Sequence, residues 1–95
     1  MSFKIDVPGM TESELTSTKT LAQLHSGQSA TIVAIHGGWG VRQRLQQIGL
    51  HIGDRIILKR SALWGGPLLL TANQADIALS RGMAHHIHVQ LPAEA

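Results

Sequence analysis

The sequence predicts one small β-barrel of about five short strands and one short helix. The chain has 95 residues, which is enough for one domain with a single small core. Hydrophobic residues make up 43% of it and charged residues only 15%, so the chain is neither a disordered polyelectrolyte nor a fibre. Short β-branched and aliphatic runs are separated by glycine-containing turns, without a long crossover. Closing such strands into a barrel buries their aliphatic faces and removes open edges.

The first predicted strand and the helix follow one another closely. Residues 30–35 form a β-branched run that ends at a group of glycines. Val41, Leu45 and Ile48 then recur at i, i+4 and i+7, which predicts a short amphipathic helix. Gly49 ends this helix as the residue after its C-cap, and a Schellman motif places a hydrophobic contact at the following leucine.

The remaining strands are short and lie close together along the chain. The Asn73-Gln74 pair is a tight connection between two of them, so these two form a hairpin. The last strand alternates polar and apolar residues, as a half-buried strand does. These strands are predicted at residues 55–60, 68–72, 75–79 and 86–90.

The predicted barrel occupies residues 21–91. Residues 1–20 are rich in Ser and Thr and carry few apolar anchors, which predicts a mobile or loosely docked arm. Residues 92–95 form a short tail.

Composition excludes several classes of function. The absence of cysteine excludes disulfides, thiolate metal sites and cysteine nucleophiles, and it fits a reducing cytoplasm. No apolar run approaches the roughly 20 residues that cross a bilayer, so direct membrane insertion is not expected. Eight Lys and Arg residues against six acidic ones do not predict a nucleic-acid surface.

The residues also argue against an enzyme. The Gly38-Trp39-Gly40 stretch lies between a strand and a helix, but it lacks the further glycine or lysine of a nucleotide-binding loop. Asp54 and Asp76 are isolated in a turn and a hairpin, and no Ser, His and Asp set has a catalytic motif around it.

The run from Arg44 to Asp54, Arg-Leu-x-x-Ile-Gly-Leu-x-x-Gly-Asp, resembles the FeoA family of ferrous-iron transport accessory proteins. The resemblance spans roughly residues 21–90 and includes Pro67-Leu68, the hairpin and Ile87-His88-Val89. It implies an SH3-like barrel and no catalysis. It also implies a small cytoplasmic regulator that docks on FeoB, the membrane transporter with a cytosolic GTP-binding domain.

Three large side chains are candidates for a docking patch. Trp39, Leu63 and Trp64 occupy glycine-flanked loops, and tryptophan is enriched in binding hot spots. Arg42, on the adjacent helix, completes the predicted partner-binding set. The alternative is that each tryptophan covers one end of the barrel. Exposed Trp or Leu residues and partly open strand edges can also pair two copies of the chain into a homo-oligomer.

Two histidines are candidate metal ligands. His86 and His88 share one face of the last strand, about 6.5 to 7 Å apart, so rotamer changes can bring them to one divalent ion. Imidazole sites prefer copper, nickel or zinc over Fe(II), and we expect weak binding with no cofactor required. The alternatives are an exposed polar strand face and, for the whole chain, a stand-alone metal sensor or chaperone.

Overall fold

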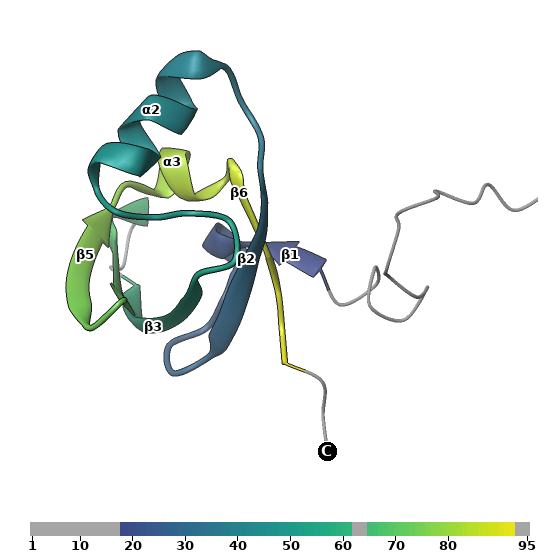
Figure 1. Cartoon of the computed structure of the whole chain (residues 1–95). Helices are drawn as coiled ribbons and strands as arrows, with labels where there is room; N and C mark the ends of the chain where they lie inside the picture. The colour runs from purple at the N-terminus through teal and green to yellow at the C-terminus, as the bar shows by residue number, and fades with distance from the viewer. Residues whose placement is uncertain (1–17, 62–64, 93–95) are drawn as a thin grey trace, which may run out of the picture.

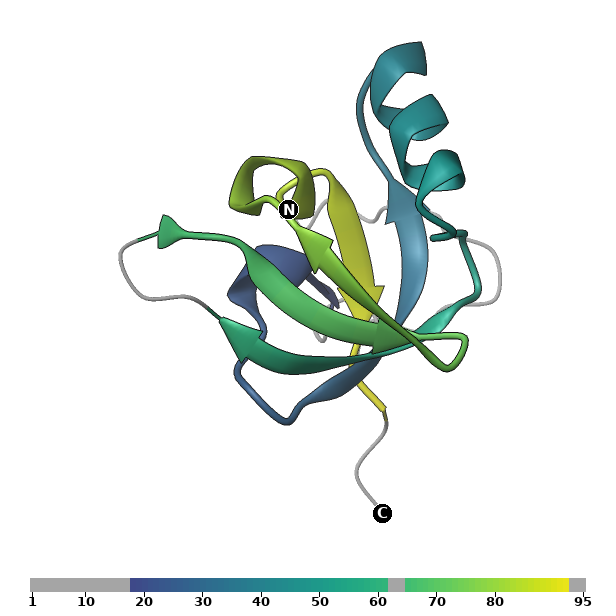
Figure 2. The same ribbon diagram turned by 90° about the vertical axis from the view of Figure 1, so that its left-hand side faces the viewer.

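The sheet of this protein is antiparallel throughout, and its strands are ordered β1-β6-β2-β3-β4-β5 (Figures 1 and 2). The computed structural model describes residues 18–61 and 65–92. Its elements are β1 (Thr18–Thr20), the 3-10 helix η1 (Leu21–Gln23), β2 (Ser29–Ile35), α2 (Trp39–Gln47), β3 (Arg55–Ser61), β4 (Leu68–Ala72), β5 (Ala75–Leu79), α3 (Arg81–Ala84) and β6 (Ile87–Gln90).

The mainly β architecture is confirmed, and the five predicted strands are present as β2 to β6. The described chain adds a sixth strand, β1, which pairs with β6 through Thr18 opposite Gln90 and Thr20 opposite His88. A three-residue Thr-Lys-Thr strand has no apolar alternation, so only its partner identifies it. Residues Thr18–Thr20, included in the predicted arm, thus lie in the sheet.

The strands curl without closing a ladder. Within residues 18–61 and 65–92, β1 and β5 are the two edges, and no pairing joins them. Register shifts interrupt the β2–β6 pairing between Ile32 and Ala34 and the β3–β4 pairing between Leu58 and Arg60. Such bulges increase twist and bend a strand, which curls the sheet around its apolar face (Figure 2).

The core is aliphatic and fills the concave face of the sheet. β6 alternates buried and more exposed residues, as predicted for a half-buried strand, and the first four residues of β3 alternate in the same way. Helix α2 contributes Leu45, which has no exposed surface. The buried residues are Leu21, Leu24, Ala30, Ile32, Leu45, Leu50, Ile56, Leu58, Leu68, Leu70, Ala72, Leu79, Ala84, Ile87 and Val89.

The end of α2 has the predicted Schellman geometry. Gly49 has a φ of +90°, and its N–H donates to the Gln46 carbonyl at 3.1 Å. The Leu50 N–H donates to the Leu45 carbonyl at 2.9 Å, and the Leu50 side chain is buried. These two bonds satisfy carbonyls that the helix leaves free, and they turn the chain toward β3.

A second helix, α3, lies between β5 and β6, whereas the sequence predicted only one helix. Ser80 is the N-cap of α3, and its hydroxyl accepts a hydrogen bond from the Met83 N–H at 3.2 Å. This cap overrides the low helix propensity of Gly82. Helices α2 and α3 lie at the same end of the sheet in both views (Figures 1 and 2).

Candidate functional site

A groove lies between α2, the end of β5 and α3. Its volume is about 510 Å³, and it is open to solvent. Apolar surface comes from Ile48, Leu79 and Met83, and polar groups come from Gln43 and Arg44. The other lining residues are Trp39, Gly40, Gln47, Ala78 and Ser80. An apolar floor with a few polar groups at its rim is typical of a site that binds a peptide or a protein surface.

Trp39 lines this groove and is 76% exposed. It is the first residue of α2, and the loop before it is held close to the helix. Gly37 has a φ of +123°, and a Cβ there would meet Val41 at 3.0 Å. This loop therefore packs closely on Val41, and Trp39 lies outside the core.

Arg42 and Arg44 use their side chains differently. The Arg42 guanidinium donates to the Ile35 carbonyl at 3.1 Å, so it caps the end of β2 while staying exposed. Arg44 instead lines the groove. Helix α2 has no acidic residue, so Arg44 gives this side of the groove a positive charge. Leu63 and Trp64, the other members of the predicted docking patch, lie outside the described residues.

Of the two candidate metal ligands, His88 lies in β6 and His86 directly precedes that strand. The ring of His88 contacts that of His36, with centroids 4.2 Å apart and ring planes at 69°. Burial, and then the nearby His36, lower the pKa of His88 below its usual value. His86 carries the carbonyl that accepts the His36 N–H at 2.7 Å. Nowhere in the described ranges do three His, Cys, Asp or Glu side chains gather closely enough to hold a metal ion.

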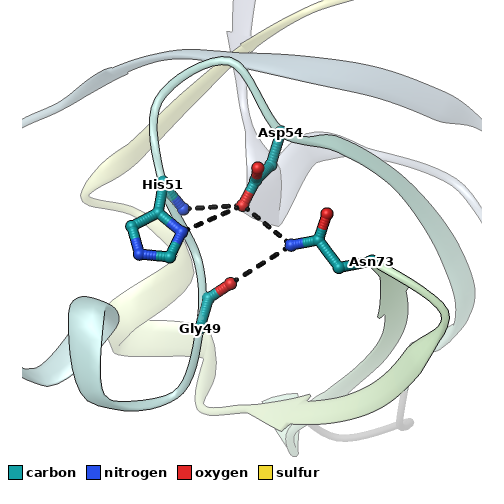
Figure 3. Close-up of polar contacts among 4 residues, drawn as sticks. All are labelled: Gly49, His51, Asp54 and Asn73. Carbon is teal, nitrogen blue, oxygen red and sulfur yellow. Dashed lines mark hydrogen bonds and ion pairs between the residues drawn. The ribbon is translucent and has the colours of Figure 1, made fainter.

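Asp54, which the sequence placed alone in a turn, makes polar contacts with two other residues (Figure 3). Its Oδ2 accepts the His51 N–H at 2.9 Å and an N–H of the Asn73 amide at 3.2 Å. The Nδ1 of His51 lies 3.4 Å from the same oxygen. Asn73 also donates to the Gly49 carbonyl at 3.5 Å. The carboxylate therefore joins the turn before β3 to the β4–β5 turn.

A family model described as the FeoA domain matches residues 19–91, which include every described strand from β2 to β6. The chain belongs to the FeoA family. The FeoA family is associated with ferrous-iron transport, and its members are non-enzymatic accessory proteins, which confirms the expected lack of catalysis. A Methanocaldococcus jannaschii protein with the provisional name Fe(2+) transport protein A is 31% identical over 70 residues, which are 74% of this chain and 83% of that protein.

Solved structures bear out the FeoA and SH3-like fold. The crystal structure of an iron uptake regulatory protein, FeoA, has a TM-score of 0.72 and 27% identity over 77% of this chain and 96% of its own. The solution structure of FeoA from Chlorobium tepidum has a TM-score of 0.71 and 28% identity, with coverages of 79% and 71%. A manganese-dependent transcriptional repressor, 17% identical, shares the fold over 42% of its chain with a TM-score of 0.74.

This FeoA chain shows two features that the sequence did not reveal. The groove needs α3 beside α2, and the histidine pair needs β2 beside β6. The Ser80 cap could have been found, since Ser is a favoured N-cap, but nothing local links His36 to His88. No helix within residues 18–61 and 65–92 is long and apolar enough to cross a bilayer.

Proposed function

We propose that this FeoA protein is a cytoplasmic regulator of ferrous-iron uptake that docks on the cytosolic part of an FeoB-type transporter. The groove between α2 and α3 is the proposed docking surface. FeoA membership supplies the link to iron transport, and the groove supplies a surface suited to binding.

The observation that carries this proposal is the exposure of Trp39. Leaving Trp39 76% exposed forgoes the hydrophobic stabilisation that burial of its ring would give. Docking recovers it, because the ring and the apolar groove floor can be covered together by one partner. Buried tryptophans at such centres contribute about 2 kcal/mol or more to binding.

Charge favours an acidic partner surface. Arg44 lines the groove, and α2, which carries it, has no acidic residue. A complementary acidic patch accelerates association mainly through the on-rate, and salt screens this effect. We therefore expect the association rate to fall as salt is raised.

Regulation requires more than docking. A bound protein shifts the population of transporter states only if it binds those states with different affinity. The proposal therefore requires different affinities for the GTP-bound and nucleotide-free forms of the transporter's cytosolic domain, and equal affinities would rule out this regulatory mechanism.

The test measures binding of the purified protein to the cytosolic GTP-binding domain of the transporter, by biolayer interferometry. We expect Trp39→Ala to weaken binding by about thirtyfold, which corresponds to loss of a hot-spot contact of about 2 kcal/mol. Ile57→Ala is the matched control, because Ile57 is 46% exposed but lies on β3, away from the groove lining. This variant should bind like the wild type, and circular dichroism verifies that both variants are folded.

Two further experiments test the second tryptophan and the need for metal. Trp64→Ala tests the loop that the sequence included in the docking patch. Affinity capture from detergent-solubilised membranes with and without chelator tests whether metal is needed, and we expect recovery of the transporter in both. Failure to recover it, or unchanged affinity with Trp39→Ala, contradicts docking through this groove.

A further inference from the structure

Three histidines lie on the outer face where β2 and β6 meet. In this ladder Ala34 is opposite His88 and Ile35 is opposite Ile87. The His36 N–H donates to the His86 carbonyl at 2.7 Å, so the same register continues past the end of β2. Ile87 is buried, and directly opposed residues share a face, so His36, His86 and His88 point away from the core.

Only two of these three rings are in mutual contact. His36 and His88 are diagonal neighbours across the ladder, with ring centroids 4.2 Å apart in an edge-to-face arrangement. A tetrahedral ion bound by two imidazole nitrogens at about 2.0 to 2.1 Å places the ring centroids about 5 Å apart. The two rings thus need to separate by only about 1 Å and to turn one nitrogen each toward a common point.

The local backbone allows this adjustment. His36 is exposed and follows the last residue of β2, whereas His88 is less exposed and is held within β6. The sheet therefore holds the backbone of His88, and the exposed side chain of His36 has room to change rotamer. This arrangement holds one ligand in place and lets the second close on an ion.

We infer that His36 and His88 form a two-imidazole site for a divalent ion of the late first transition row. No third His, Cys, Asp or Glu side chain from the described part of the chain joins them, so water fills the remaining coordination positions. Imidazole ligands and the Irving–Williams order favour copper, nickel and zinc over Fe(II). This site is separate from the docking groove, and its existence does not depend on the proposed docking.

The site differs from the one that strand alternation predicts. His86 and His88 are two residues apart on one strand, whereas His36 approaches His88 from the neighbouring chain segment. The two possibilities share His88 and differ in the second ligand, so single substitutions distinguish them.

Isothermal titration calorimetry of the full chain with Ni²⁺ and, separately, Zn²⁺ tests the inference. We expect one equivalent to bind the wild type. We expect His36→Ala and His88→Ala each to weaken binding by about a hundredfold, because a lone imidazole loses the effective concentration of the second. His86→Ala and His85→Ala are matched controls from the same histidine-rich segment, and they should bind like the wild type. Fe(II), titrated without oxygen, should bind more weakly than either metal.

A second measurement uses the unsubstituted chain, so it does not depend on the folding of any variant. Substoichiometric Ni²⁺ should broaden the imidazole proton resonances of His36 and His88 before those of the other histidines. Loss of binding in His86→Ala with binding retained in His36→Ala would overturn the inference in favour of the strand pair. Equal binding by all four variants, or equal broadening of all histidines, would show only scattered, non-specific binding.

Discussion

One carboxylate shows how a single side chain positions two turns of this protein. The Asp54 side chain is 18% exposed, and it accepts hydrogen bonds from the His51 backbone and the Asn73 amide (Figure 3). Hydrogen bonds to an ionised acceptor are stronger than those between neutral groups. The short run from Gly49 to Asp54 therefore has a structural function in this FeoA chain.

We expect Asp54→Ala to lower the free energy of unfolding by about 1.5 to 3 kcal/mol, because it removes charged hydrogen bonds and leaves the Asn73 amide without this acceptor. Urea denaturation measures the change. Asn73→Ala should lower the free energy of unfolding by less than Asp54→Ala does. The double variant should lower it by less than the sum of the two single-variant changes. Strict additivity would show that the two side chains do not share an interaction. Asp76 accepts a hydrogen bond from the Thr71 hydroxyl and pairs with Lys59, but its side chain is 55% exposed, so Asp76→Ala should lower the free energy of unfolding less than Asp54→Ala.

The β4–β5 hairpin shows conformational strain within one element. Ala72 pairs with Ala75, so the loop has two residues, and both have a positive φ: 52° at Asn73 and 66° at Gln74. This conformation matches the twist of a two-residue hairpin, but it favours asparagine and glycine. Asn73 fits it, and Gln74 does not.

We expect Gln74→Gly to stabilise the protein by about 0.5 to 1 kcal/mol. Relief of left-handed strain contributes about 1 to 2 kcal/mol, and the added freedom of glycine in the unfolded chain offsets about 0.4 to 1 kcal/mol. The measurement is the urea midpoint at constant m-value. Asn73→Gly is the control, and it should give no gain because it removes the amide bonded to Asp54. An unchanged or lower midpoint for Gln74→Gly would contradict this account.

A single aliphatic core holds the whole molecule together. The buried residues of the described chain come from η1, α2, α3, five strands and the connections that hold Leu24 and Leu50, and no polar side chain is among them. Leu70 has no exposed surface and lies on β4, between β3 and β5. A cavity at Leu70 would therefore weaken the packing of β3, β4 and β5 at once.

We expect Leu70→Ala to lower the free energy of unfolding by about 2 to 5 kcal/mol, a large share of the roughly 5 to 15 kcal/mol of a small domain. Leu70→Met keeps the volume and should cost less than about 1.5 kcal/mol. Thermal and urea unfolding of both variants provide the comparison. Similar losses for the two would show that the core at Leu70 tolerates a cavity as easily as a change of shape.

The elements that sequence analysis predicted well carry local signals. Alternation indicated β6, and Asn73-Gln74 indicated the hairpin. The glycine at position 49 indicated the end of α2. β1 was missed because so short a strand is recognisable only by its pairing with β6. α3 was missed because the favourable Ser80 N-cap is followed by Gly82, which has a low helix propensity.

The sequence alone established the fold class and family resemblance, because apolar periodicity and glycine positions act over a few neighbouring residues. Only the tertiary structure placed His36 against His88 and α3 beside α2. These contacts join segments that are far apart along the chain, and they depend on strand register and on the curl that bulges impose on the sheet. Composition and residue spacing do not show which distant segments come into contact. The groove and the histidine pair therefore become visible only in the folded sheet.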